Sequence, residues 1–311
     1  MSWREMTGNQ APRTVRAPFD SARFGRPVER LTVPAGAGPS FEPVREAVLG
    51  SAADVIVLRY PAGHVGWFAE LTSLGRTAVL ADSLAYWRLR AGRGRAPRPR
   101  TDLLTGGPLP PAAVPGPVSD IFAAYRSHYV ANPLFDAAAA LEGYREWAVR
   151  SAASGRCVAL RERDADGARA AVTAPPLPAP SEDGDGAGNG NGNGAGNGNG
   201  AGDGDGEGNE GGGGDDGGGV LALATLSEDD GATEILLAGV VSRARGQGLY
   251  AHLLAAVEER TLARGGREVV ISTQGHNTGV QRAWARYGFE PVHTFLTVHL
   301  VRSRLLRGRR R

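Results

Sequence analysis

Residues 235–250 read ILLAGVVSRARGQGLY, and this stretch decides the fold of the chain. It begins with an apolar run, Ile235 to Val241, that is typical of a buried strand. A short turn rich in glycine and arginine follows, and then leucines recur at helical spacing until Gly265. The first amides of a helix have no partner within it, and the helix dipole makes that end positive. Because Gly246 and Gly248 carry no Cβ, the turn predicts a site for a phosphate or pyrophosphate.

Two common phosphate-binding motifs do not fit this turn. The dinucleotide fingerprint requires a glycine where Ala251 stands, and no Gly-Lys-Ser/Thr follows as a P-loop requires. The pattern Arg245-x-x-Gly248-x-Tyr250 instead resembles the R/Q-x-x-G-x-G/A pyrophosphate loop of the GNAT superfamily of acyl-CoA N-acyltransferases. Tyr250 replaces the last small residue of that loop.

A second element of the same superfamily follows at the expected distance. Residues 268–273 are predicted to form a strand, and residues 277–289, NTGVQRAWARYGF, resemble the family's N-x-x-A-x-x-x-Y-x-x-x-G-F helix. Two matching elements in the right order are more specific than either alone. The resemblance implies a GNAT fold, α/β (α+β) in class, with a mixed, mostly antiparallel central sheet.

The remaining chain divides by composition and periodicity. Residues 28–33, 55–60 and 78–87 are predicted strands, with helices between them, so this half forms a βαβαβ lobe that resembles half a GNAT domain. Ser119 and Asp120 are expected to cap the next helix. The predicted organisation is a flexible tail at 1–16, the N-terminal lobe at 17–90, an Arg/Pro/Gly linker at 91–117, the GNAT acetyltransferase domain at 118–301 and a basic tail at 302–311.

A Gly/Asn/Asp-rich insert at 181–219 is predicted to be disordered, because it has almost no apolar residues with which to form a core. It carries nine acidic residues and no basic ones, so the chain's formal net charge of +2 hides a basic remainder. A basic folded part suits polyanions such as the CoA phosphates or a nucleotide sugar. No nucleic-acid-binding motif is present, so nucleic acid is not an expected partner.

Composition also bears on location and metals. The single cysteine, Cys157, excludes an internal disulfide and a cysteine zinc cluster, and no metal is expected. No apolar run approaches the roughly 20 residues that a membrane span needs. The first residues lack the apolar core of a signal peptide, so a cytoplasmic location is expected.

Shorter matches narrow the resemblance. They include Phe19-Asp20-Ser21 followed by Phe24-Gly25, Tyr125-x-x-His128-Tyr129, and Ser272-Thr273-Gln274 with Asn277. With the two-lobed layout they are similar to TDP-fucosamine acetyltransferase-like enzymes, which acetylate a dTDP-linked 4-amino-4,6-dideoxyhexose. The resemblance implies acetyl transfer from acetyl-CoA, as co-substrate, to a primary amine. The expected acceptor is a small-molecule amine, with a nucleotide sugar as one candidate, and a homodimer stays open.

The resemblance also implies a set of cofactor-binding residues. The pantetheine arm is expected to pair with the backbone of the central strand, and the pyrophosphate is expected to bind the amides of the turn. Trp284 stands where the family commonly has the tyrosine that protonates the departing thiolate, and an indole N–H cannot deliver that proton. The cofactor-binding residues implied are Ala238, Val240, Val241, Arg245, Gly246, Gln247, Gly248, Leu249, Tyr250, Asn277 and Trp284.

The catalytic acid and base are assigned less directly. Tyr287 and Tyr250 are the candidates for an acid, and a thiolate is also a fair leaving group without one. His128 is the candidate base because its ordinary pKa is near neutrality. Tyr129 and Gln274 are the expected substrate-binding residues. Glu234, at the start of the central strand, is expected to be exposed.

Two classes of function therefore remain open. The first is an N-acyltransferase for an amino sugar, a peptide or an aminoglycoside amine. The second, suggested by Trp284, is an acyl-CoA-binding protein with weak or no catalysis.

Overall fold

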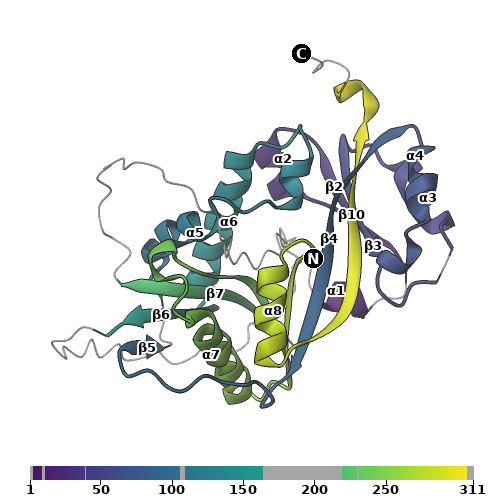
Figure 1. Ribbon diagram of the computed structural model, residues 1–311. Coiled ribbons are helices and arrows are strands. Elements are labelled where there is room, and N and C mark those ends of the chain that lie inside the picture. The colour runs from purple at the N-terminus through teal and green to yellow at the C-terminus, as the bar shows by residue number, and fades with distance from the viewer. Residues whose placement is uncertain are drawn as a thin grey trace.

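Ten strands form one sheet that runs through the whole molecule (Figure 1). The computed structural model describes residues 3–8, 11–38, 40–105, 109–163, 219–229 and 231–306. The strands are β1 (Arg13–Arg16), β2 (Val28–Thr32), β3 (Val55–Pro61), β4 (Arg76–Arg90), β5 (Leu103–Thr105), β6 (Cys157–Glu162), β7 (Val220–Asp229), β8 (Ala232–Val240), β9 (Glu268–Gln274) and β10 (Glu290–Arg302). The helices are α1 (Trp3–Thr7), α2 (Pro18–Phe24), α3 (Glu42–Gly50), α4 (Trp67–Thr72), α5 (Pro115–Phe122), α6 (Ala137–Ala153), α7 (Leu249–Ala263) and α8 (Thr278–Tyr287).

The sheet order is β1-β2-β3-β10-β4-β9-β8-β7-β6-β5. Among the described strands, only the pairs β2–β3 and β8–β9 are parallel, and the other neighbours are antiparallel. The predicted α/β fold with a mixed, mostly antiparallel sheet is confirmed. The central strand–turn–helix is also confirmed, as β8 followed by α7.

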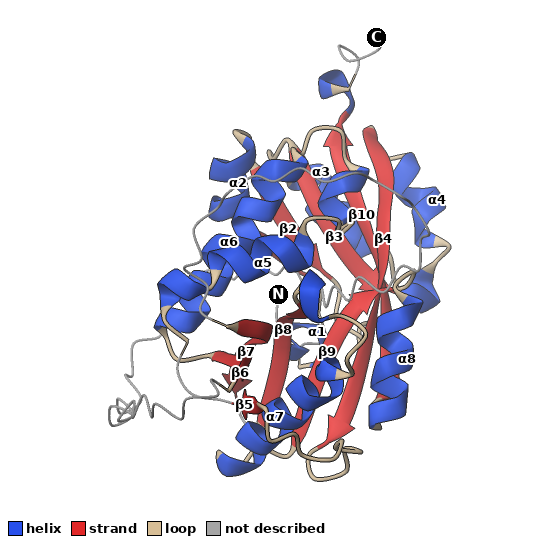
Figure 2. Cartoon of the chain, turned by 60° about the vertical axis from the view of Figure 1, so that its left-hand side comes forward, coloured by secondary structure: helices blue, strands red, loops and turns tan. Residues whose placement is uncertain are grey.

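Strand β10 comes from the end of the chain but lies between two strands of the N-terminal lobe. It pairs with β3, where Val298 faces Leu58, and with β4, where Thr297 faces Asp82. The βαβαβ lobe is therefore β2-α3-β3-α4-β4, with β10 from the C-terminal part of the chain inserted between β3 and β4. Hydrogen bonding through β10 and β4 joins the two halves of the chain into the single sheet seen in Figure 2.

Helices cover both faces of this part of the sheet, because successive strand residues point to opposite sides. Ile56 and Leu58 of β3 pack with α3 and α4, which lie on one side of the strands in Figure 1. Val55 and Val57 pack on the other side with Phe24 of α2 and with the segment leading into α6. The continuous apolar run of β3 is thus explained by burial on both faces.

Two expectations about local structure need correction. The segment at 1–16, predicted as a flexible tail, contains α1, in which Met6 is fully buried, and β1, which pairs with β2. Ser119 and Asp120 lie within α5, which begins at Pro115. Asp120 instead accepts hydrogen bonds from the backbone and hydroxyl of Ser242, the latter at 2.7 Å.

Apart from its last residue, Gly219, the predicted insert lies outside the described residues, which stop at 163 and resume at 219. Its two flanking strands are neighbours, because Arg161 of β6 pairs with Val220 of β7. The last five residues of the basic tail also lie outside the described residues. No helix in the described part of the chain is long and apolar enough to cross a membrane.

Candidate functional site

The glycine-rich turn connects the end of β8 to the start of α7. A short 3-10 turn, Ser242–Ala244, follows the strand, and α7 begins directly after Gly248. Gly246 and Gly248 adopt φ angles of 79° and 74°, a left-handed conformation that other residues adopt only at a cost. A Cβ added to either glycine would meet no protein atom within 4 Å, so both face open space. The backbone of this turn is therefore accessible to a ligand.

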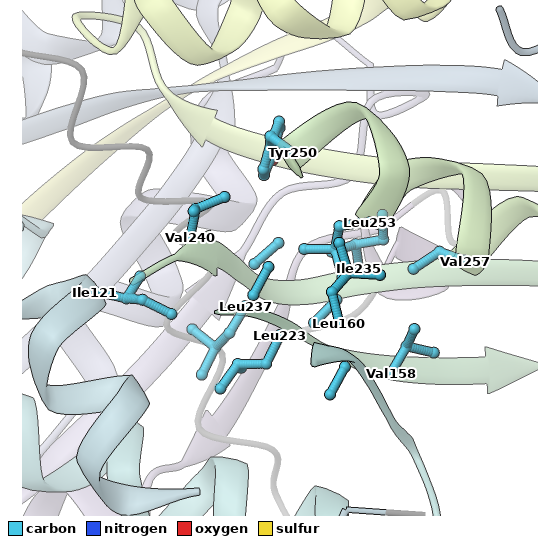
Figure 3. Packing of buried hydrophobic residues seen from close by; sticks show 14 of the residues in the cluster. Ile121, Val158, Leu160, Leu223, Ile235, Leu237, Val240, Tyr250, Leu253 and Val257 are labelled. Atoms are coloured by element: carbon cyan, nitrogen blue, oxygen red, sulfur yellow. The ribbon is translucent and has the colours of Figure 1, made fainter. Parts of the chain in front are cut away.

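The turn is held in place by an apolar core beneath it. Figure 3 shows Leu253 and Val257 of α7 beside Ile235 of β8, with Leu237 and Leu223 below. All five side chains are buried. Because the helix and the strand are fixed to each other by this packing, the N-terminus of α7 keeps its position relative to the end of β8.

A cavity of about 400 Å³ opens between the turn, α7 and α8. Its lining includes three arginines, Arg95, Arg245 and Arg286, and no carboxylate among the described residues. The arginines and the positive end of α7 both favour a polyanion. The full lining is Arg95, Val240, Ala244, Arg245, Gly246, Gly248, Leu249, Tyr250, Ala251, Leu254, Ala283, Arg286 and Tyr287.

Seven of the predicted site residues line this cavity: Val240, Arg245, Gly246, Gly248, Leu249, Tyr250 and Tyr287. Two of the lining residues, Arg95 and Arg286, were not among those predicted from the sequence. Arg95 comes from the predicted linker, and its amide donates to the carbonyl of Tyr287 at 2.6 Å. Only the fold brings that segment to α8. Arg286 could have been found from sequence, because it lies two residues after Trp284 in the second motif.

Strands β8 and β9 separate beside the cavity. Their parallel pairing ends at Ile235 and Ile271, whereas β8 continues to Val240 and β9 to Gln274. Ala238, a predicted cofactor-binding residue, therefore has a partner on β7 but none on β9. A gap in pairing leaves backbone groups of both strands for an extended ligand.

Trp284 of α8 is fully buried and is linked to the turn. Its indole Nε1 donates to the hydroxyl of Tyr250 at 3.0 Å, and its ring meets Trp87 edge-on at 6.1 Å between centroids. Burial raises the pKa of the Tyr250 hydroxyl. Trp284 thus packs in the core and also positions Tyr250, which lines the cavity.

Tyr287 also lines the cavity, but its hydroxyl is engaged elsewhere. It donates to Oε2 of Glu258 at 2.6 Å, while Oε1 of Glu258 accepts from the amides of Gly92 and Gly94 at 2.7 and 2.9 Å. Burial and the bond to Glu258 raise the pKa of Tyr287. The Glu258 carboxylate therefore ties α8 and the segment after β4 to α7.

His128 and Tyr129 do not line the described cavity. Nδ1 of His128 lies 2.9 Å from Nε2 of His299, and Nδ1 of His299 lies 3.2 Å from the side-chain nitrogen Nδ2 of Asn132. Burial, and then the charge of Arg59, lower the pKa of His128 and bring that of His299 to about 3. Both rings are therefore neutral at pH 7. The hydroxyl of Tyr129 donates to Asp20 at 3.2 Å.

The other predicted residues lie around the cavity without lining it. Val241 is buried, and its amide donates to Leu221. Gln247 is exposed, and its carbonyl accepts from Arg100. Asn277 precedes α8, but its side chain donates to Thr273 and does not cap the helix.

Gln274 is buried on the opposite face of the sheet from α8, where its side-chain oxygen accepts from Tyr125. Glu234 lies on the same face as Gln274 and is also buried, not exposed as expected from its place at the strand start. Its Oε2 accepts from the amide of Trp3 at 2.8 Å. Helix α1, missed from sequence, accounts for this burial.

The described residues contain no group of three or more His, Cys, Asp or Glu side chains arranged to hold a metal ion.

Comparison with known proteins agrees with this architecture. A sequence model of the acetyltransferase (GNAT) family matches residues 209–289, which include β8, the turn, α7, β9 and α8. No curated protein matches the sequence significantly. Among solved structures, the chain is similar to a GCN5-related N-acetyltransferase from Sphaerobacter thermophilus, with 14% identity, a TM-score of 0.52, and coverage of 94% of this chain and 76% of the other.

A conserved protein of unknown function from Staphylococcus epidermidis is also similar, with 11% identity, a TM-score of 0.50, and coverage of 95% of this chain and 93% of the other. A Drosophila protein gives 13% identity, a TM-score of 0.50, and coverage of 89% and 75%. At such identities the likeness shows the fold alone. The fold is that of the GNAT superfamily, and the family match over the turn and its flanking elements supports a GNAT acetyltransferase.

Proposed function

We propose that the protein is an N-acyltransferase that moves an acetyl group from acetyl-CoA to a primary amine. The observation that carries this proposal is the basic cavity at the N-terminus of α7, next to the point where β8 and β9 separate. A ligand with a charged pyrophosphate and a long amide-bearing arm suits both features. The GNAT fold and the family match support the same activity in general terms.

The chain offers groups for each part of the cofactor. The amides from Gly246 to Tyr250, with Arg245, would bind the pyrophosphate, and the backbone near Ala238 and Val240 would pair with the pantetheine arm. Acetyl-CoA supplies an acyl group on a thiol leaving group. The protein must position the amine, remove its proton and stabilise the thiolate.

We assign Tyr250 as the acid that protonates the departing thiolate of CoA. It lines the cavity, and its hydroxyl is oriented by the indole of Trp284. Tyr287, the sequence-based candidate, has its hydroxyl committed to Glu258. His128 stays a prediction as base, and its buried bond with His299 favours a positioning role.

A nucleotide-linked amino sugar stays the candidate acceptor, because the two-lobed resemblance points to it. The alternative, a CoA-binding protein with little catalysis, is disfavoured by Tyr250, which places a hydroxyl beside Trp284.

The test measures CoA binding and transfer separately. Calorimetric titration with CoA tests the cavity, and release of free thiol from acetyl-CoA is then followed with glucosamine, spermidine and a dTDP-4-amino-4,6-dideoxyhexose. We expect CoA to bind and at least one amine to be acetylated. Binding without turnover on any amine would favour the non-catalytic alternative, and absence of CoA binding would refute both.

A further inference from the structure

Three buried polar groups lie on the face of the sheet opposite α7 and α8. They are both carboxylate oxygens of Asp82, the hydroxyl of Ser272 and the hydroxyl of Tyr144. None has a hydrogen-bond partner of acceptable geometry among the described residues. Buried polar atoms in folded proteins are nearly always paired with protein, water or ligand. These atoms, among them a buried carboxylate, therefore need an explanation.

The strand register places Asp82 just beyond the end of β9, on the strand that flanks β9 on the side away from β8. Leu84 of β4 pairs with Gln274, the last residue of β9, and Asp82 is two residues further along β4. Two strand residues span roughly 7 Å. Asp82, Leu84, Ser272 and Gln274 share one face by alternation. The acyl group of an arm lying in the gap would reach this face close to Asp82.

The surroundings of Asp82 are polar. Tyr125 donates to Gln274, and its ring lies 6.1 Å from that of Tyr144. Thr297 faces Asp82 across the sheet, and its hydroxyl accepts from Nε of Arg59 at 3.2 Å. The region thus places the hydroxyl of Thr297 and the side-chain amide of Gln274 near a carboxylate whose oxygens form no hydrogen bond of acceptable geometry with the described residues, and both neighbours favour its ionised form.

The titratable groups that face Asp82 come from several elements. They are Arg59 on β3, His276 before α8, Tyr125 after α5 and Tyr144 on α6. Burial raises the pKa of Asp82, and the charge of Arg59 opposes that rise. In such a setting a carboxylate and an ammonium ion are both poorly solvated, so passing a proton between them to form a neutral pair is favoured.

We propose that Asp82 is the acceptor-binding carboxylate, which receives the protonated primary amine of the substrate and takes one of its protons. This rests on the proposed acyltransferase function. The ammonium gives a proton to Asp82, and the neutral nitrogen then attacks the thioester carbonyl carbon. A C–N bond forms and the C–S bond breaks; Tyr250 gives its proton to the departing thiolate and is reprotonated by the second nitrogen proton. Asp82 finally returns its proton to solvent.

This role selects for amines over alcohols of the same shape. A hydroxyl cannot supply the positive charge that the buried carboxylate needs, whereas an ammonium supplies both charge and donors. A binding site that hydrogen-bonds a polar group of its substrate discriminates against analogues without that group, because the site's own buried polar atoms then have no partner. The specificity of the enzyme would thus come from a residue of the N-terminal lobe, outside both sequence motifs.

The test compares binding of matched ligands to the full-length protein saturated with CoA. Calorimetry uses glucosamine against glucose, and a dTDP-4-amino-4,6-dideoxyhexose against the corresponding dTDP-6-deoxyhexose. For the wild type we expect at least one amine to bind ten times more tightly than its hydroxyl counterpart. Asp82→Asn should remove that preference and leave CoA affinity within twofold. Asp82→Ser serves as a second variant should the first fail to fold.

Asp229→Asn is the matched control, because Asp229 is exposed and pairs with Arg4 at the surface. It should keep the preference for the amine. The proposal is refuted if Asp82→Asn retains the preference, or if the wild-type CoA complex prefers no amine to its hydroxyl counterpart. Loss of CoA binding by the wild type would instead refute the proposed function, so the two failures can be told apart.

Discussion

Trp284 and Tyr250 form a complementary pair of departures from the GNAT motifs. The helix motif has tyrosine where Trp284 stands, and the loop motif has a small residue where Tyr250 stands. The structure joins them, since the indole of Trp284 donates to the hydroxyl of Tyr250 at 3.0 Å. The hydroxyl that position 284 of α8 lacks is thus supplied by Tyr250 of α7. Each departure alone weakens the match, whereas the two together restore a phenol beside the second motif.

Tyr250→Phe is predicted to lower kcat for acetyl transfer by roughly 10- to 100-fold. This is a small effect for the loss of a general acid, because a thiolate leaves readily without one. The KM for acetyl-CoA should stay within twofold. Steady-state thiol release gives both constants. Tyr287→Phe is the matched variant, and it should mainly lower Tm because Glu258 loses a donor. The opposite ranking in kcat would make Tyr287 the acid.

Asp82 gives a prediction about pH and stability. Because burial raises its folded-state pKa, the folded protein holds the proton more tightly than the unfolded chain. The contribution of Asp82 to stability is therefore fully present below the unfolded pKa and is lost as pH rises through the folded pKa. Asp82→Asn should raise Tm at pH 8 and change it little at pH 4. Thermal unfolding of both proteins across this range checks the prediction, and a Tm difference independent of pH would contradict it.

At the scale of elements, the β8–turn–α7 unit follows from sequence because its signals are local. An apolar run, two glycines and a helical leucine spacing each act within a few residues. The same holds for β9 and α8. The boundaries of α5 were missed, because Ser119 and Asp120 look like a cap. Pro115 begins that helix one turn earlier, and Asp120 contacts Ser242 across the fold.

The turn offers a test with a control at the opposite end of the same helix. Gly248 precedes α7 and Gly265 follows it, with φ angles of 74° and 75° and open space around both. Alanine at either position should cost a similar strain, about 1–2 kcal/mol. Only Gly248→Ala should also weaken CoA binding, by tenfold or more in calorimetry. Equal CoA affinity in the two variants would argue against a cofactor site at the turn.

At the scale of the whole molecule, the shared sheet makes the N-terminal lobe dependent on the rest of the chain. Strand β10 lies between β3 and β4, and buried Val298 and Leu300 complete the core of that lobe. Residues 1–90 expressed alone should therefore fail to fold, giving the circular dichroism of a disordered chain. The full chain should unfold in one transition. A cooperatively folded 1–90 fragment would show that β10 is dispensable.

The insert gives the opposite prediction. Arg161 and Val220 are already paired neighbours, and the entropy of closing a loop grows only logarithmically with its length. Deleting residues 181–219 should change Tm by no more than a few degrees and leave thiol release within twofold. A large loss of transfer would assign a role to the insert.

The sequence by itself determined the turn, its two flanking elements and the mixed sheet, and it led to the proposal of an acyl-CoA ligand, because those signals lie within short windows of chain. Only the tertiary structure decided where β10 goes, that Arg95 reaches the cavity, and that Asp82 lies beside Gln274. These depend on strand pairing between segments some 200 residues apart. The alternation of apolar residues indicates that a strand is buried, but it does not determine which strand pairs with it. That pairing is fixed only when the whole sheet packs.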